Sequence, residues 1–385
     1  MFDMKRTIKK DLVVDARMIS ASGIGIYLQN ILSGLTGSFD IGLLGNREEL
    51  TGFDWAENLD LIPCGAPIYT IKEQFVLPRL IPPCRVFWAP HFVTPVFPIR
   101  ARRKLVTIHD VYHLAFRKEL PLSQRIYANR MYRHAVSFAD RLITVSRASR
   151  GDIIRYTGCP PEKITVIPNG VDQQRFSLKP DRKTVEDIRQ KYALPNRYLL
   201  FVGNIKPHKN LRTFVAAFRE LLQTEPDVHL LIVGNKEGFI TGDREISDRI
   251  EADEQLRQRV RFSGHVAHDD LPAIYHQAEL FVFPSFYEGF GLPPLEAMAS
   301  GCPVIASRIP AVQEVCGDAA AYFDPASPGE LRDLLAALIR DFRKREKLKT
   351  LALLRAEQFS WKTSVAKHKL LLEEMLAVSG PEGPG

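Results

Sequence analysis

The chain has 385 residues, of which 45% are hydrophobic and 25% charged, and its formal net charge is +7. This length predicts two domains, and this balance is typical of a globular protein with a buried core, not of a disordered or fibrous chain. No apolar run reaches the roughly 18 residues of a membrane span, and the basic N-terminus lacks the apolar stretch of a secretory signal. The five cysteines are scattered without metal-site spacing, which favours reduced thiols in the cytoplasm.

Strands and helices alternate through the first half of the chain. Short runs rich in β-branched and aromatic residues predict strands, and apolar residues at helical spacing predict helices. The predicted strands are 12–15, 39–44, 59–62, 85–88, 104–109, 141–145 and 164–167, and the predicted helices are 26–35, 121–139 and 147–156. The polar stretch that follows, residues 172–182, is the expected linker between two domains.

The second half alternates more regularly and ends in helices. The predicted strands are 198–202, 228–233, 260–262, 279–283, 304–306 and 320–323, and the predicted helices are 181–192, 211–223, 244–256, 271–276, 295–300, 329–354 and 359–376. Such alternation predicts an α/β fold with parallel sheets that helices cover on both faces.

The most informative segment is FPSFYEGFGLPPLEAMASGCPVIAS, which starts at Phe283. A buried strand is expected to end here, and a glycine-rich turn then leads into a helix whose first turn holds two prolines. The amides at the start of that helix form an anion site. Glu288 precedes the turn and Glu296 lies inside the helix, so carboxylates that accept hydrogen bonds from sugar hydroxyls flank a phosphate site. This combination indicates a nucleotide-sugar.

The same segment resembles the E-x7-E motif of retaining glycosyltransferases of family 4, with Glu288 and Glu296 as its two glutamates. The resemblance implies the GT-B fold, which has two facing Rossmann-like domains and a C-terminal helix that crosses back to the first domain. We therefore expect an N-terminal domain of residues 1–178, joined by 360–385, and a C-terminal nucleotide-sugar-binding domain of residues 179–359.

A second loop, FVGNIKPHKNL, follows a predicted strand and precedes a predicted helix. Lys209 then lies at the carboxyl edge of the sheet, where ligands of α/β proteins bind, and Asn210 is expected to cap the helix. The loop resembles the family segment that holds the diphosphate. Asn204 or His208 stands where the family has an arginine, so the phosphate partner of Lys209 is left open, with His208 or Arg212 as alternatives.

The first domain offers a glycine loop and a histidine. Gly23 and Gly25 lie between the first strand and the first helix and resemble the family's N-terminal glycine loop, although a simple helix-entry turn is the alternative. His109 follows the strand 104–109 and resembles the family histidine that contacts the donor sugar; the alternative is a satisfied core residue.

The resemblance implies roles for these residues. His109, Glu288 and Lys209 are the candidate catalytic residues. The candidate donor-binding residues are Gly23, Gly25, Asn204, His208, Lys209, Glu288, Gly289, Phe290, Gly291, Leu292 and Glu296. The sequence has no D-x-D motif, so we expect neither a metal site nor a cofactor, with the nucleoside-diphosphate sugar as donor substrate.

Positive charge gathers in one part of the first domain. Residues 100–155 hold thirteen lysines and arginines against four acidic residues. The predicted helix 121–139 combines these charges with aromatic residues, which suits peripheral contact with anionic lipids. A merely soluble basic face is the alternative, and no nucleic-acid-binding motif accompanies the charge.

These observations predict a cytoplasmic enzyme bound peripherally at the inner face of the membrane. It would move a hexose, with mannose from GDP-mannose as first choice, to a lipid-linked or polysaccharide-precursor acceptor. The preference for mannose rests on resemblance to bacterial polysaccharide mannosyltransferases in ARMISASGIGIYLQNIL and TIHDVYHLAF. The alternatives are a UDP-sugar-dependent enzyme of the same family, a nucleotide-sugar epimerase of the same fold and a non-catalytic partner protein.

Overall fold

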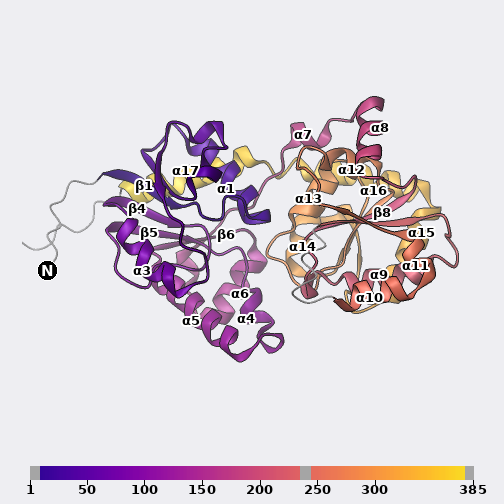
Figure 1. The fold of residues 1–385 in the computed structure, drawn as a ribbon, viewed down its shortest axis with the longest axis horizontal. Coiled ribbons are helices and arrows are strands. Elements are labelled where there is room, and N and C mark those ends of the chain that lie inside the picture. The colour runs from indigo at the N-terminus through magenta and orange to yellow at the C-terminus, as the bar shows by residue number, and fades with distance from the viewer. Residues whose placement is uncertain (1–8, 235–243, 378–385) are drawn as a thin grey trace, which may run out of the picture. The chain divides into compact units, whose positions relative to one another are not determined.

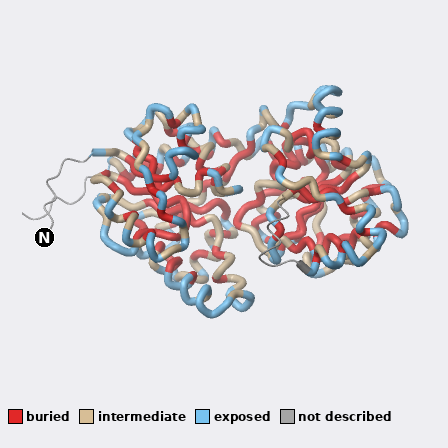
Figure 2. Tube along the Cα trace, in the orientation of Figure 1, coloured by how far each residue is buried: buried red, intermediate tan, exposed pale blue. Residues whose placement is uncertain are grey.

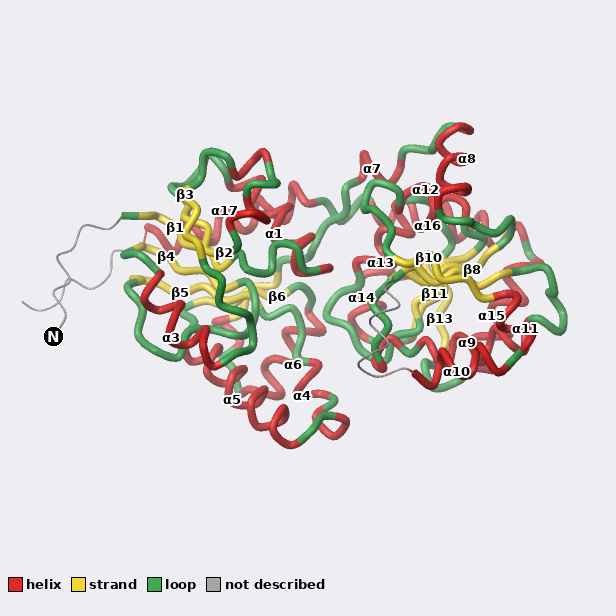
Figure 3. Tube along the Cα trace, in the orientation of Figure 1, coloured by secondary structure: helices red, strands yellow, loops and turns green. Residues whose placement is uncertain are grey.

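The computed structural model describes residues 9–234 and 244–377. The first eight and last eight residues lie outside the described residues. They include part of the N-terminus, for which no secretory signal is expected, and the end of the first predicted domain. The chain forms two compact units: the first runs up to Gly170 and resumes at Trp361, and the second is Val171–Ser360. Each unit holds a central sheet with helices around it (Figures 1 and 3).

The described strands of the first unit form a parallel sheet in the order β3-β2-β1-β4-β5-β6-β7. Its strands are β1 (Lys10–Asp15), β2 (Ile41–Gly45), β3 (Asp60–Pro63), β4 (Cys84–Ala89), β5 (Ala101–Thr107), β6 (Arg141–Thr144) and β7 (Ile164–Val166). Its helices are α1 (Ser22–Leu35), α2 (Arg47–Leu50), α3 (Ile71–Leu80), α4 (Tyr112–Ala115), α5 (Leu122–Phe138), α6 (Arg147–Thr157) and α17 (Trp361–Ala377).

The described strands of the second unit form a parallel sheet in the order β10-β9-β8-β11-β12-β13. Its strands are β8 (Tyr198–Val202), β9 (His229–Val233), β10 (Val260–Gly264), β11 (Leu280–Phe283), β12 (Val304–Ser307) and β13 (Ala320–Phe323). Its helices are α7 (Gln173–Ser177), α8 (Arg182–Lys191), α9 (Leu211–Leu221), α10 (Arg244–Ala252), α11 (Glu254–Arg259), α12 (Leu271–Gln277), α13 (Leu292–Ala299), α14 (Pro310–Cys316), α15 (Pro328–Arg340) and α16 (Phe342–Ala356).

Both sheets reverse their strand order at one point, as Rossmann-like sheets do. The reversal falls between β1 and β4 in the first unit and between β8 and β11 in the second. The central strands β1, β2, β4, β8, β9, β11 and β12 are buried along most of their length (Figure 2), which explains why they appear in the sequence as nearly continuous apolar runs. Helix α17 packs on α1, so the expected return of the chain end to the first domain is confirmed.

Several element boundaries differ from the predictions because capping side chains were not weighed. The predicted helix 244–256 is two helices, since the Asp253 side chain accepts hydrogen bonds from Gln255 and Leu256 and starts α11. The predicted helix 329–354 is likewise divided where the Asp341 side chain caps α16. Helices α2, α3, α4, α7 and α14 were not predicted at all, and α7 lies within the expected linker.

Candidate active site

Two loops meet at the carboxyl edge of the second sheet, beside its reversal point. One follows β8 and the other follows β11, and the amide of Phe286 donates a 2.8 Å hydrogen bond to the carbonyl of His208. The Asn210 side-chain amide donates to the carbonyls of Pro284 at 2.9 Å and Pro325 at 2.8 Å. Asn210 occupies the N-cap position of α9 as predicted, but its backbone is left-handed, with φ 54°, and its side chain makes no cap hydrogen bond.

These loops bring Lys209 and Glu288 into direct contact. Lys209 Nζ lies 2.7 Å from Glu288 Oε1, and the two side chains are only 19% and 12% exposed. The ammonium group also lies over the Phe283 ring, 5.6 Å from its centroid. A largely buried, charge-assisted pair of this kind is held firmly in place. The structure thus joins two residues that the sequence placed on separate loops.

The turn after Glu288 consists of Gly289, Phe290 and Gly291 and enters α13 at Leu292. Gly291 has φ 125°, a conformation that favours glycine, and prolines occupy the first turn of the helix as predicted. The Phe290 ring is buried and packs edge-on against Phe359 at 5.9 Å. The turn is therefore anchored, and the positive end of the α13 dipole lies directly after Glu288.

Glu296 lies within α13 and is buried, with 6% of its surface exposed. The Tyr275 hydroxyl, on α12, donates a 3.1 Å hydrogen bond to Glu296 Oε2. Burial raises the pKa of Glu296 to about 7, although the Tyr275 hydrogen bond and the charge of Arg175 act in the opposite direction. Sequence reasoning missed Tyr275, because a tyrosine on an apolar helix face gives the same signal as a core residue.

The remaining residues of the β8 loop are less clearly placed for phosphate. Asn204 lies two residues beyond β8, and His208 belongs to the 3-10 turn Pro207–Lys209 just before α9. Arg212, the other alternative, forms a 2.7 Å ion pair with Glu245 on α10. The partner of Lys209 in phosphate binding stays a prediction.

His109, in the first unit, lies two residues beyond β5 and is half-buried. Its Nε2–H donates to the carbonyl of Pro90 at 3.0 Å, and its ring packs edge-on against Tyr27 at 4.8 Å. Burial lowers the pKa of His109 to about 4. The ring is therefore neutral at pH 7, and its Nδ1 is a hydrogen-bond acceptor.

The predicted glycine loop is part of a helix. Gly23 and Gly25 lie in the first turn of α1, which starts at Ser22, so the alternative of a helix-entry turn describes their conformation. Gly23 is exposed and Gly25 is buried. A Cβ atom at Gly25 would lie 2.6 Å from the backbone oxygen of Ile19, so packing alone requires glycine there.

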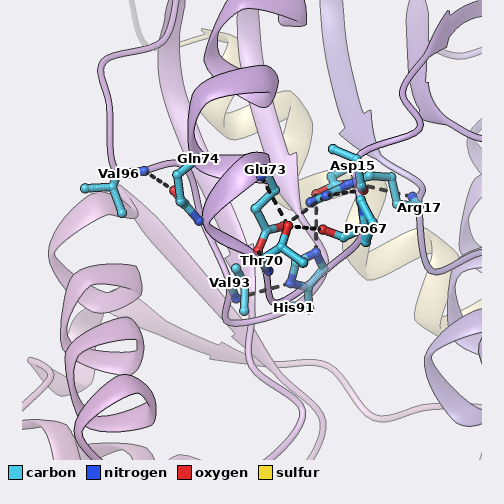
Figure 4. Close-up of polar contacts among 10 residues, drawn as sticks. Asp15, Arg17, Pro67, Thr70, Glu73, Gln74, His91, Val93 and Val96 are labelled. Carbon is cyan, nitrogen blue, oxygen red and sulfur yellow. Dashed lines mark hydrogen bonds and ion pairs between the residues drawn. The ribbon is translucent and has the colours of Figure 1, made fainter. Parts of the chain in front are cut away.

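A buried charged cluster at the reversal point of the first sheet was not predicted (Figure 4). Arg17 donates two hydrogen bonds to Asp15, at 2.8 and 2.7 Å, and forms a 2.9 Å ion pair with Glu73. His91 Nδ1 accepts from the amide of Val93, so its Nε2–H faces Asp15 Oδ2 at 3.3 Å. The cluster ties the ends of β1 and β4 to α3, where Glu73 also completes a capping box with Thr70.

Two properties of the described residues concern metal ions and membranes. Within residues 9–234 and 244–377, no group of three or more histidine, cysteine or acidic side chains is placed to hold a metal ion. No helix in the same residues has the length and apolar character needed to cross a bilayer.

Comparisons with known proteins place these features in a family. Residues 184–353 match the family model "Glycosyl transferases group 1", and residues 70–175 match "Glycosyltransferase Family 4". The O-antigen chain mannosyltransferase B of Escherichia coli is 29% identical over 91% of this chain and 96% of its own length.

Among solved structures, a sucrose-phosphate synthase from Thermosynechococcus elongatus matches 96% of this chain and all of its own, with a TM-score of 0.77 at 20% identity. Anabaena HepE, in a complex with UDP-glucose, matches 96% of this chain and all of its own, with a TM-score of 0.72 at 20% identity. These likenesses confirm the predicted GT-B fold. The two family models together match most of the chain, and the chain belongs to glycosyltransferase family 4, in the class of retaining hexosyltransferases.

Proposed function

We propose that the enzyme transfers mannose from GDP-mannose to a lipid-linked or polysaccharide-precursor acceptor. The observation that carries the nucleotide-sugar part is the Lys209–Glu288 pair at the reversal point of the second sheet, with Glu296 eight positions further on. The preference for mannose is supported by the E. coli mannosyltransferase, which aligns over nearly its whole length.

Lys209 and the positive end of α13 stabilise the departing diphosphate in this proposal. Departure of the diphosphate places negative charge on phosphate oxygens, and fixed positive groups in a shielded site lower the energy of that charge. Lys209 is only 19% exposed and already oriented, so little reorganisation is needed when the charge develops. Glu288, the partner of Lys209, accepts hydrogen bonds from hydroxyls of the donor sugar.

Glu296 binds the ribose, and His109 contacts the transferred sugar near the reacting carbon. Both roles suit the ionisation of these groups: burial favours the uncharged form of each, so neither places a full charge in the site at pH 7 without a partner. The neutral His109 ring offers Nδ1 as an acceptor for a sugar hydroxyl. Gly23 and Gly25 retain a proposed place beside the donor because they open α1 at the carboxyl edge of the first sheet.

The acceptor is the less constrained part of the proposal. A lipid-linked acceptor requires the enzyme to work at a membrane surface, and the basic segment 100–155 supports a peripheral position on an anionic cytoplasmic leaflet. We propose no nucleic-acid partner.

Melting temperatures measured against GDP-, UDP-, ADP- and TDP-sugars test the donor. A ligand that binds the folded state stabilises it by mass action, and we expect GDP-mannose to give the largest increase. Lys209→Ala should reduce the increase produced by GDP more than that produced by GMP, because it removes a contact to phosphate.

Three outcomes would change the proposal. A largest shift with a UDP-sugar would replace GDP-mannose by the donor type bound in the HepE structure. Conversion of the nucleotide-sugar into an epimer without any acceptor would replace transfer by epimerisation. A Lys209→Ala variant that binds GDP as tightly as the native enzyme would remove Lys209 from the phosphate site.

A further inference from the structure

Exposed apolar side chains gather on one part of the first unit. The described residues include fourteen large hydrophobic side chains that are exposed, and eight of them lie in three short segments, 69–75, 96–97 and 122–127. Ile71 on α3 is 81% exposed and Leu122 on α5 is 69% exposed. Such a concentration of exposed apolar groups marks an interaction surface, whereas isolated ones need no explanation.

The three segments are joined by direct contacts. On the α3 side, the rings of Phe75 and Phe97 lie 5.1 Å apart, and the Gln74 side chain accepts a 2.8 Å hydrogen bond from the Val96 amide. On the α5 side, His134 Nε2 donates to the carbonyl of Pro95 at 2.9 Å. We call the surface formed by 69–80, 92–102 and 122–138 the α3/α5 face.

A further contact closes the α3/α5 face between its two helices. Phe92 lies 5.9 Å from the Tyr69 ring and stacks at 4.1 Å on Tyr132 of α5. The exposed side chains of α3, the 92–102 segment and α5 therefore lie on neighbouring elements.

The charges on this surface are all positive. The α3/α5 face contains seven lysines and arginines and a single acidic residue, Glu73, which is 1% exposed and paired with Arg17. Along α5, Leu122, Ile126, Arg130 and Arg133 follow one another at helical spacing and are all exposed. Among the described residues, neither Arg130 nor Arg133 has an acidic partner.

We propose that the α3/α5 face is the membrane-docking surface, which inserts its apolar side chains into an anionic bilayer while its cations contact the lipid head groups. The inference rests on the proposed lipid-linked acceptor and names the partner that brings enzyme and acceptor together. An interfacial surface needs apolar and basic side chains side by side and no exposed acid, and this face has all three properties. A protein partner would instead have to present a complementary acidic surface.

One cation of α5, Arg125, does not belong to the exposed set. Arg125 does not face outward with Arg130 and Arg133: its guanidinium donates to the carbonyls of Leu120 and Lys118, both at 2.7 Å, and so fixes the turn before α5. Residues 69–80 and 92–99, which the sequence did not single out, supply five of the eight exposed apolar side chains.

Co-sedimentation with vesicles of phosphatidylglycerol and phosphatidylcholine tests the proposal without donor or acceptor. We expect binding to rise with the phosphatidylglycerol fraction and to fall with salt. Arg130→Glu with Arg133→Glu should lower the partition coefficient at least about tenfold at low salt. Ile71→Ser with Leu122→Ser should cause a similar loss that persists at high salt, because insertion of apolar groups is not screened.

Matched variants on other surfaces provide the controls. Lys362→Glu with Lys367→Glu changes the net charge equally on exposed positions of α17, and Leu354→Ser with Leu370→Ser removes two comparably exposed leucines. These variants should bind vesicles like the native protein, and all variants should keep its melting temperature and its shift with GDP-mannose. Equal losses in test and control variants, or a native protein that ignores anionic vesicles at low salt, would overturn the proposal. Failure of sugar transfer alone would bear only on the proposed function, since vesicle binding is measured without it.

Discussion

At the scale of single residues, burial shifts the ionisable candidate residues of each unit toward neutrality. Glu296 accepts a hydrogen bond from Tyr275, and burial raises its pKa to about 7. Burial lowers the pKa of His109 to about 4. Lys209 and Glu288 solve the same problem differently, because each neutralises the other across 2.7 Å. The free enzyme therefore keeps its polar site residues largely buried without leaving an isolated charge in place.

Glu296 makes the stability of the enzyme depend on pH. Its pKa is about 7 in the folded protein and near 4.5 when unfolded, so the folded state binds the proton more tightly. This contribution to stability is complete below pH 4.5 and is lost as the pH rises through 7, by at most about 3 kcal/mol. Urea denaturation of the native protein and of Glu296→Gln should show a stability difference that shifts in favour of the variant across this range.

Tyr275→Phe supplies the check on this assignment. The Tyr275 hydroxyl lowers the pKa of Glu296, so its removal should move the loss of stability to higher pH. In the Glu296→Gln background the same change should leave the pH dependence as it is. A difference between native protein and Glu296→Gln that is flat from pH 4.5 to 8 would contradict the raised pKa.

At the scale of elements, close backbone approaches decide where glycine is needed. Gly25 lies in the first turn of α1 against the carbonyl of Ile19, which also accepts a 2.8 Å hydrogen bond from the Gln29 side chain. That carbonyl is thus held from two sides and cannot easily move away from a new Cβ atom. Gly151, in α6, has no atom within 4 Å of the same position and is exposed.

Substitution of these two glycines should have opposite effects. Gly25→Ala is expected to destabilise the first unit by about 1–3 kcal/mol, the usual cost of overpacking. Gly151→Ala should stabilise it by about 0.5–1 kcal/mol, because alanine is the better residue inside a helix. Urea denaturation measures both, and a Gly25→Ala variant as stable as the native protein would show that the first turn of α1 adapts freely.

Most elements, and the two loops that carry Lys209 and Glu288, could be predicted because their signals lie in short stretches of sequence. Buried parallel strands appear as apolar runs, so β8 was predicted to the residue. The turn after Glu288 could be predicted because glycine occurs where the backbone bends and proline occurs in the first turn of the following helix. Helix α3 escaped prediction because it has Pro78 inside and two strongly exposed apolar residues on its surface, which blurs its amphipathic pattern.

Contacts between distant residues could not be read from the sequence at all. Tyr275 meets Glu296 across 21 positions, and Arg17 meets Glu73 across 56. No local spacing encodes such pairs; they exist because parallel strands and their helices bring their ends to one edge of a sheet. The same limit applies to the α3/α5 face, which three separate segments assemble.

At the scale of the whole molecule, each unit has a hydrophobic core of its own. In the first unit, a buried chain of hydrogen bonds joins the C-terminal helix α17 to α1 and to the sheet. His368 Nδ1–H donates to the carbonyl of Ser364, so its Nε2 accepts from the Tyr27 hydroxyl at 2.7 Å. The Tyr27 oxygen also lies 3.2 Å from Thr107 Oγ1, which receives the indole N–H of Trp88 at 3.0 Å.

Separate cores predict that the two units unfold in separate transitions, which two different perturbations should move one at a time. Tyr27→Phe leaves His368 Nε2 buried without its donor. It should lower the free energy of unfolding of the first unit by about 1–3 kcal/mol and so lower its transition temperature. A nucleoside diphosphate at 100 times its dissociation constant should raise the free energy of unfolding of the second unit by about 2.7 kcal/mol, and with it the transition temperature of that unit. Differential scanning calorimetry resolves the two effects, with the exposed Tyr127→Phe as the matched control that moves neither. A single transition that both perturbations shift would show that the two units unfold as one.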